Sequence, residues 1–324
     1  MSYWQTATQQ AAVMPGGRDG ILPPVDTGDR DEGTRGGADE VQHLVDLVSR
    51  GGLFVLTGAG LSTDSGIPDY RGQDGVRRVM PMQYAEFTAT SAARCRYWAR
   101  SYIGWQRFSA ARPNLGHTAV TRLHHGGWVD LLVTQNVDGL HTEAGMADLV
   151  ELHGSLAWVV CLACRARTPR EQHQRRLDDA NPGFTAYLSG VVSDGSRVSS
   201  QIRPDGDIVL ADEVVSEFRL VTCQSCGSDT LKPDVVFFGE AVPKDRVERC
   251  FAALESSRGL LVLGSSLAVM SGYRFVRRAA AMGLPVAIVT RGATRGDEQA
   301  TVKVDAPLTP TLRDLTEALT HSRR

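Results

Sequence analysis

The sequence predicts an α/β fold built on a doubly wound parallel sheet. Short apolar segments alternate with amphipathic helical patterns along most of the chain, and this alternation favours parallel strand pairing. Several apolar segments end in small or polar turns, which is typical of a ligand-binding sheet edge. Two Cys-x-x-Cys pairs interrupt the alternation. We therefore expect a Rossmann-type sheet into which a helical module and a small zinc-binding domain are inserted.

The predicted boundaries follow these changes of pattern. Residues 39–155 and 230–324 form the Rossmann-type nucleotide-binding domain, residues 156–229 form the zinc-binding domain, and the helical module covers about 75–115. Residues 1–38 are rich in Gly, Pro, Gln, Asp and Arg without periodicity, so they are expected to be a disordered leader. The leader lacks the apolar region of a signal peptide and is too acidic for a mitochondrial transit peptide, so a cytoplasmic location is expected.

Composition excludes several classes of partner. The 324 residues are 42% hydrophobic, enough to bury a large core, and the formal net charge is only −2. This charge gives no argument for nucleic acid or an anionic membrane as a partner, and no apolar run approaches the roughly 20 residues of a membrane span. We expect neither partner, and we expect a monomer.

A glycine-rich turn follows the first predicted strand. An amphipathic helix at 39–50 leads into a buried strand at 52–57, which runs directly into Gly58-Ala59-Gly60. Small residues let the backbone approach a ligand, and free N–H groups at a helix start can bind a pyrophosphate. A purely structural turn would carry the same glycines.

The segment after this turn favours a nucleotide. Asp64, Asp69 and Arg71 surround Gly66 and Pro68, where a helix would not continue. The chain is therefore expected to leave as an ordered, charged loop that covers a bound cofactor.

The helical module contains an aromatic and arginine-rich segment at 82–112. Tyr97 and Arg100 are three residues apart and would share a helix face. A phenol and a guanidinium together could bind a carboxylate or carbonyl. From the residues alone, a solvated helix surface is the favoured explanation of the pair.

Polar residues follow the second predicted strand at 128–134. Gln135, Asn136 and Asp138 are placed at its carboxyl end, where their amides and carboxylate suit ribose hydroxyls and a carboxamide. Helix N-capping by Asn136 or Asp138 would explain one of them but not all three.

Two histidines lie near predicted strand ends. His153 follows the short strand at 149–152, and His141 follows the polar turn of the second strand. A histidine at a strand end beside a nucleotide site is a candidate general base. His153 is favoured because Gly154 leaves its imidazole open to a substrate.

The two cysteine pairs predict a metal site. Cys161-Leu162-Ala163-Cys164 and Cys223-Gln224-Ser225-Cys226 supply four thiolates for tetrahedral zinc. Disulfides and redox pairs are the competing explanations. Four thiolates leave no open coordination position, so the zinc should be structural. The polar stretch 189–207 is expected to loop out between the pairs.

The last third of the chain returns to strands and helices. Sheet-like residues at 234–240 precede a helix at 243–257, a strand at 259–263 and the turn Gly264-Ser265-Ser266. A helix at 271–282, a strand at 285–289, the turn Thr290-Arg291-Gly292 and a helix at 309–320 complete the pattern. The four turns should align along one sheet edge, which is the predicted ligand crevice.

This set of motifs resembles the sirtuin family over roughly residues 40–320, most closely the class II branch that includes mitochondrial lipoamidases and deacylases. The matching motifs, in family order, are Gly58-Ala59-Gly60-x-Ser62, Gly66-Ile67-Pro68-Asp69-x-Arg71, Gln135-Asn136-x-Asp138, His153-Gly154, the two Cys-x-x-Cys pairs, Val236-x-Phe238-Gly239-Glu240 and Gly264-Ser265-Ser266-Leu267.

The resemblance implies an NAD-dependent protein-lysine deacylase. In the family mechanism the acyl-lysine carbonyl oxygen attacks the ribose carbon that releases nicotinamide, a base activates a ribose hydroxyl, and O-acyl-ADP-ribose is released. The implied catalytic residues are His153, as the base, with Asn136 and Asp138. The implied NAD-binding residues are Gly58, Ala59, Gly60, Ser62, Thr63, Asp69, Tyr70, Arg71, Gln135, Asn136, Asp138, Gly264, Ser265, Ser266, Thr290, Arg291, Gly292 and Leu308.

The resemblance also implies how acyl-lysine protein substrates bind. Val236, Phe237, Phe238, Gly239 and Glu240 would carry the substrate backbone as an added strand. In class II desuccinylases a Tyr-x-x-Arg motif binds the acidic end of the acyl group, and Tyr97 and Arg100 fit it. The expected preference is therefore for acidic or bulky acyl groups over acetyl.

Three departures from the family pattern and three competing functions accompany this prediction. Ser271 replaces a common proline, Thr290-Arg291 replaces an asparagine-containing motif, and the insertion between the cysteine pairs is long.

A dehydrogenase would need an acidic residue at the end of a following strand, which 76–81 does not supply. Protein mono-ADP-ribosylation and weakly active NAD sensing would use the same NAD-binding motifs.

Overall fold

The computed structural model describes residues 37–70, 81–184, 215 and 217–321. Its main sheet has six parallel strands in the order β3-β2-β1-β7-β8-β9. From one edge to the other, the strands are Leu149–Glu151, Val129–Thr134, Leu53–Thr57, Gly259–Leu263, Val286–Val289 and Val302–Val304. The predicted doubly wound parallel sheet is confirmed. β9 was not predicted, because three residues carry too little pattern to indicate a strand.

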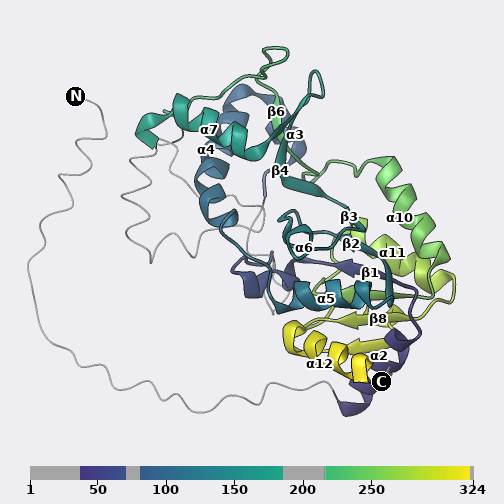
Figure 1. The fold of residues 1–324 in the computed structure, drawn as a ribbon. Helices are drawn as coiled ribbons and strands as arrows, with labels where there is room; N and C mark the ends of the chain where they lie inside the picture. The colour runs from purple at the N-terminus through teal and green to yellow at the C-terminus, as the bar shows by residue number, and fades with distance from the viewer. Residues whose placement is uncertain (1–36, 71–80, 185–214, 216, 322–324) are drawn as a thin grey trace, which may run out of the picture.

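Helices cover both faces of this sheet (Figure 1). One face is covered by α2 (Ala38–Ser49), α5 (Leu115–His125) and α12 (Leu308–His321), whose core includes Val55 of β1. The other face is covered by α10 (Lys244–Ser256) and α11 (Met270–Ala281), which pack around Phe54 and Leu56 of β1. Alternate side chains of β1 therefore enter two cores, which explains why the strand is a continuous apolar run.

A smaller layer lies beyond the carboxyl ends of the strands (Figure 1). It contains α3 (Tyr84–Ala89), α4 (Ser91–Phe108), α7 (Arg170–Ala180) and an antiparallel sheet in the order β5 (Arg167–Pro169), β4 (Gly154–Cys161), β6 (Leu231–Val235). Trp98 of α4 is buried here, and its Nε1 donates a hydrogen bond to the carbonyl of Leu231 at 2.8 Å. The predicted helical module and zinc domain thus share one core.

The turn after β1 differs from the prediction. Gly58 is followed by two short 3-10 turns, η1 (Ala59–Leu61) and η2 (Thr63–Ser65), and not by an α-helix. Gly66 then adopts a left-handed conformation at φ +81°, and Pro68 follows two residues later. Both residues prevent helix propagation, so the segment expected to begin an α-helix is instead a loop.

The polar stretch 189–207 lies outside the described residues, and so do residues 1–36 of the predicted leader. Within the described part of the chain, no helix combines the length and apolar character needed to cross a bilayer.

His173 is a buried histidine in the core of the smaller layer. Its ring centroid lies 4.3 Å from that of Trp98, and neither ring nitrogen has a hydrogen-bond partner among the described residues. Burial lowers its pKa to about 3, and the nearby charges of Arg170 and Arg176 act in the same direction. The folded protein therefore holds His173 neutral, whereas the unfolded chain protonates it below about pH 6.5.

We predict that replacing His173 with Phe weakens the acid sensitivity of the fold. In wild type, this one histidine lowers the free energy of unfolding by about 2 kcal/mol between pH 7 and pH 5, because only the unfolded state gains its proton. Urea unfolding of both proteins at the two pH values measures the difference. An equal loss of stability in His173→Phe and wild type would contradict the prediction.

Candidate active site

A cavity of about 760 Å³ opens at the carboxyl ends of β1, β2, β7 and β8 and is closed on its other side by the smaller layer. It brings together most of the predicted site. The predicted residues in its lining are Gly58, Ala59, Gly60, Ser62, Asp69, Tyr70, Tyr97, Gln135, Asn136, Asp138, His153, Val236, Phe237, Phe238, Gly239, Glu240, Gly264, Ser265, Ser266, Thr290 and Arg291. The expected alignment of turns along one sheet edge is therefore observed.

Several predicted residues do not line the cavity. Thr63 is exposed and donates its hydroxyl to the carbonyl of Gly60, and Gly292 donates its N–H to Asp305. Leu308 lies behind the lining, with its side chain against Gly264. Arg71 lies outside the described residues.

Arg100, a predicted substrate-binding residue, also lies outside the cavity lining. It is half-buried on α4, one turn beyond Tyr97, and its Nε is buried without a hydrogen-bond partner in the described part of the chain. The spacing of Tyr97 and Arg100 placed both on one helix face, but only Tyr97 reaches the cavity.

The two glycine turns of the sheet edge are in direct backbone contact. The N–H of Gly60 donates to the carbonyl of Gly264 at 2.9 Å. A Cβ at Gly60 would lie 2.9 Å from that carbonyl oxygen, and one at Gly264, where φ is +63°, would lie 2.7 Å from the N–H nitrogen of Leu61. Side chains at these positions would clash, so glycine at both positions is what allows the two turns to approach this closely.

A polar network connects the turns after β1, β2 and β7. Ser62 donates its hydroxyl to Asp138 at 2.7 Å and accepts from Asn136 Nδ2 at 3.0 Å, while Gln135 Nε2 donates to Ser265 Oγ at 2.9 Å. Burial raises the pKa of Asp138, and hydrogen bonds from the Leu140 N–H and the Ser62 hydroxyl oppose this rise. The Leu140 contact places the Asp138 carboxylate beside the start of the short α6 (Leu140–Glu143), whose N-cap residue is Gly139.

His153 is held at both ring nitrogens. Nδ1 lies 2.8 Å from the carbonyl oxygen of Gln135, and Nε2 lies 2.8 Å from Oγ of Ser271. Because a carbonyl only accepts hydrogen bonds, Nδ1 carries the proton and Nε2 holds the lone pair. Burial lowers the pKa of His153, and the positive charges of Arg246 and Arg274 add to this effect. The imidazole is thus a neutral base at physiological pH.

His141, the other histidine near a strand end, lies in the core. It is 2% exposed, its Nε2 lies 3.1 Å from the Thr57 hydroxyl, and its ring packs edge-on against His117. Burial lowers the pKa of His141 to about 3 and that of His117 to about 4. His141 does not line the cavity, which agrees with the choice of His153.

The segment after β6 borders the cavity on the side of the smaller layer. The bridge between Gln83 and Phe238 ties it to the chain before α3. Glu240 folds back to accept a hydrogen bond from the Phe237 N–H at 2.9 Å and pairs with Lys232 Nζ at 3.1 Å, where Lys232 is 3% exposed. A buried ammonium with carboxylate and carbonyl partners fixes this loop in one conformation.

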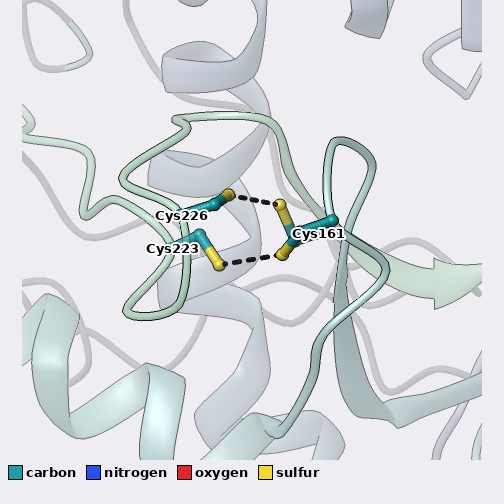
Figure 2. Close-up of side chains that lie close together, drawn as sticks. Cys161, Cys223 and Cys226 are labelled. Carbon is teal, nitrogen blue, oxygen red and sulfur yellow. Dashed lines mark hydrogen bonds between the residues drawn. The ribbon is translucent and has the colours of Figure 1, made fainter.

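The four paired cysteines form one cluster. Their Sγ atoms all lie within 4.8 Å of one another, with Cys161 and Cys226 at 3.6 Å and Cys164 and Cys223 at 3.7 Å (Figure 2). A tetrahedron with Zn–S bonds of about 2.3 Å has edges of about 3.8 Å, which these separations match. All four are free thiols, which excludes the disulfide explanation in this structure. The cluster lies outside the cavity lining, as a structural zinc requires.

Sequence reasoning missed part of the lining. The apolar part of the cavity wall includes Ile67, Met82, Val269 and Met270. In the sequence these residues look like ordinary core residues. Ser271 was noted only because it replaces a common proline, although its contact with His153 makes it part of the site. Gly272, the residue after Ser271, was the sequence signal that could have indicated this contact, because a glycine there permits α11 to approach Gln135 closely.

Comparison with known proteins agrees with this geometry. The sequence profile of the Sir2 family matches residues 58–271. The chain belongs to the Sir2 family, the sirtuins. It is 51% identical over 284 residues to "NAD-dependent protein deacetylase 1" of Streptomyces coelicolor, covering 87% of this chain and 91% of the relative. It is 45% identical over 274 residues to "NAD-dependent protein deacylase Sirt4" of Drosophila melanogaster, covering 83% and 84% of the two chains.

Solved sirtuin structures share the fold. One described as "Sir2-p53 peptide-NAD+" superposes with a TM-score of 0.66 at 26% identity, covering 86% of this chain and 98% of the other. A structure of "Sir2Tm bound to a propionylated peptide" superposes with a TM-score of 0.65 at 25% identity, with the same coverage. The class II assignment, the cytoplasmic location and the monomeric state stay predictions.

We predict that zinc occupancy depends on the clustered cysteines alone. Wild type should contain about one zinc per chain, and Cys164→Ser should lose most of it and unfold at a lower temperature, because three thiolates do not close the site. Metal analysis and thermal unfolding measure both effects. Cys95→Ser is the matched control, since Cys95 lies outside the cluster. Equal zinc content in the two variants would contradict the assignment.

Proposed function

We propose that this sirtuin is an NAD-dependent protein-lysine deacylase that releases nicotinamide and O-acyl-ADP-ribose. The observation that carries the proposal is the neutral His153, whose only available lone pair is on Nε2, in the wall of a cavity formed by the glycine turns. The names of the relatives support the activity and the use of NAD. When bound, NAD supplies an electrophilic ribose carbon and a good leaving group.

Each part of the cavity has a proposed task. The turns at Gly58 to Gly60 and at Gly264 to Ser266 would border the phosphates, and Asn136 and Asp138 would bind the nicotinamide side. His153 would take a proton from a ribose hydroxyl through Nε2. The segment Val236–Glu240, held by Lys232, would carry the backbone of the acyl-lysine substrate as an added strand.

The activity is tested by incubating the protein with NAD and an acyl-lysine peptide and measuring nicotinamide and O-acyl-ADP-ribose. Wild type should form both in equal amounts, and His153→Ala should lose at least about 100-fold in product formation, as expected for a general base. His125→Ala, at an exposed histidine outside the cavity, is the control. Labelled ADP-ribose attached to protein would instead indicate an ADP-ribosyltransferase, and binding of NAD without turnover would indicate a sensor.

We further propose that acidic or bulky acyl groups are preferred over acetyl. Tyr97 lines the cavity, and two guanidinium groups belong to its surroundings: Arg100 follows one turn later on α4, and Arg170 packs over the ring of Trp98. Arg170 is 1% exposed and is bound by Ser101 and Gln174, with no carboxylate partner in the described residues. Buried positive charge without a counter-ion favours a negative group nearby.

We predict that Arg100→Met selectively weakens activity on acidic acyl groups. Activity on succinyl-, glutaryl- and methylglutaryl-lysine peptides should fall about 10-fold in kcat/KM, because a positive charge one helix turn from Tyr97 is removed from behind the cavity wall, while acetyl and lipoyl peptides change little. Arg96→Met on the same helix, whose arginine pairs with Glu86, is the control. Unchanged activity on the acidic peptides would contradict the proposed role of Arg100.

A further inference from the structure

The contact between His153 and Ser271 has a consequence for proton transfer. The two residues are 118 positions apart in the chain, yet Oγ of Ser271 lies 2.8 Å from Nε2 of His153. Because Nδ1 donates to the Gln135 carbonyl, the Ser271 hydroxyl donates to Nε2. The single lone pair that can accept a proton is therefore already occupied by a hydroxyl.

The position of Ser271 is fixed by the same residue that orients His153. The side chain of Gln135 lies so close to Gly272 that a Cβ there would come 2.4 Å from its Oε1. Gln135 Nε2 is in turn bonded to the Thr57 carbonyl at 3.2 Å and to Ser265 at 2.9 Å. Gln135 thus holds the imidazole with its backbone and locates the start of α11 with its side chain.

Ordinary structural tasks do not explain the orientation of Ser271. A serine near a helix start usually caps the helix, but the N-cap of α11 is Val269 and no side-chain cap bond is present. The other buried serines of the lining have different partners: Ser62 binds Asp138, and Ser265 accepts from Gln135. Ser271 is 8% exposed, and it belongs to the cavity wall.

We propose that Ser271 is a catalytic residue that relays a proton from the bound cosubstrate to His153. This inference rests on the proposed deacylase function and adds one residue to it. A ribose hydroxyl in the cavity gives its proton to Oγ of Ser271, while the Ser271 proton passes to Nε2. One O–H bond breaks at the ribose, whose oxygen keeps the electron pair and would use it to bond to the acyl carbon, and one N–H bond forms at His153; Ser271 exchanges its proton and remains neutral. His153 becomes an imidazolium, still bound to the Gln135 carbonyl.

The relay is tested first in the wild-type protein. Formation of O-acyl-ADP-ribose is measured in a single turnover, with enzyme in excess, in mixtures of H₂O and D₂O. Two protons that move together give a curved dependence of the rate on deuterium fraction. A straight line means that one proton moves, and this result overturns the relay.

Three variants test whether the rate of acyl transfer depends on the Ser271 hydroxyl. Ser271→Ala should lose about 100-fold in the rate of acyl transfer, within the range of a missing acid–base group, and Ser271→Thr should recover most of it. Nicotinamide release should change little in either variant, because it precedes the proton transfer. Ser257→Ala is the matched control: its serine is also buried, donates to the Leu254 carbonyl at 2.7 Å and lies outside the cavity lining. Ser271→Ala with wild-type acyl transfer overturns the proposal.

A measurement on the free protein separates this proposal from the proposed function. In ¹H–¹⁵N spectra of the His153 ring, wild type should show protonation at Nδ1 and a hydrogen-bonded Nε2, and Ser271→Ala should move the Nε2 resonance toward that of a free lone pair. An unchanged Nε2 resonance overturns the relay whatever the activity. An unchanged Nε2 resonance together with O-acyl-ADP-ribose formation by the wild type leaves the deacylase function standing without the relay, whereas a wild type that forms no O-acyl-ADP-ribose removes the function itself.

Discussion

The backbone contact between Gly60 and Gly264 is the constraint on which the site depends. It joins the turns of β1 and β7, two neighbouring strands of the sheet, at a distance that no side chain permits. The turn of β2 is then attached by Asn136 and Gln135, and the imidazole of His153 by the carbonyl of Gln135. Each functional group is therefore positioned relative to one short segment of glycine backbone.

Burial has a second, chemical role in this molecule. Desolvation lowers the pKa of His153 and raises that of Asp138, so the cavity favours a neutral imidazole and opposes ionisation of its carboxyl group. Hydrogen bonds from Ser62 and Leu140 act against the shift at Asp138. The same residues that fix the geometry thus also set the charge state in which the site meets a ligand.

The sequence was sufficient for five of the six strands of the main sheet, for the positions of the turns along its edge and for the metal cluster, because their signals are local. β1 is a continuous apolar run, Gly58 to Gly60 requires a close approach, and the cysteine spacing is that of a zinc site. It was insufficient where the answer depends on how elements pack. Spacing placed Tyr97 and Arg100 on one face, but the direction of α4 relative to the cavity decides that only Tyr97 lines it. The pairing of Ser271 with His153 likewise depends on where α11 meets Gln135.

The shared core of the smaller layer links the metal to the substrate. Cys161 and Cys223 belong to the same apolar cluster as Tyr97 and Phe237, which form part of the cavity wall. The two aromatic rings pack against each other at 5.2 Å, and Trp98, beside Tyr97, is hydrogen-bonded to the strand that follows the second cysteine pair. Because these residues share one core, a change of residue size near the cysteine cluster would be transmitted through close packing to the aromatic wall of the cavity.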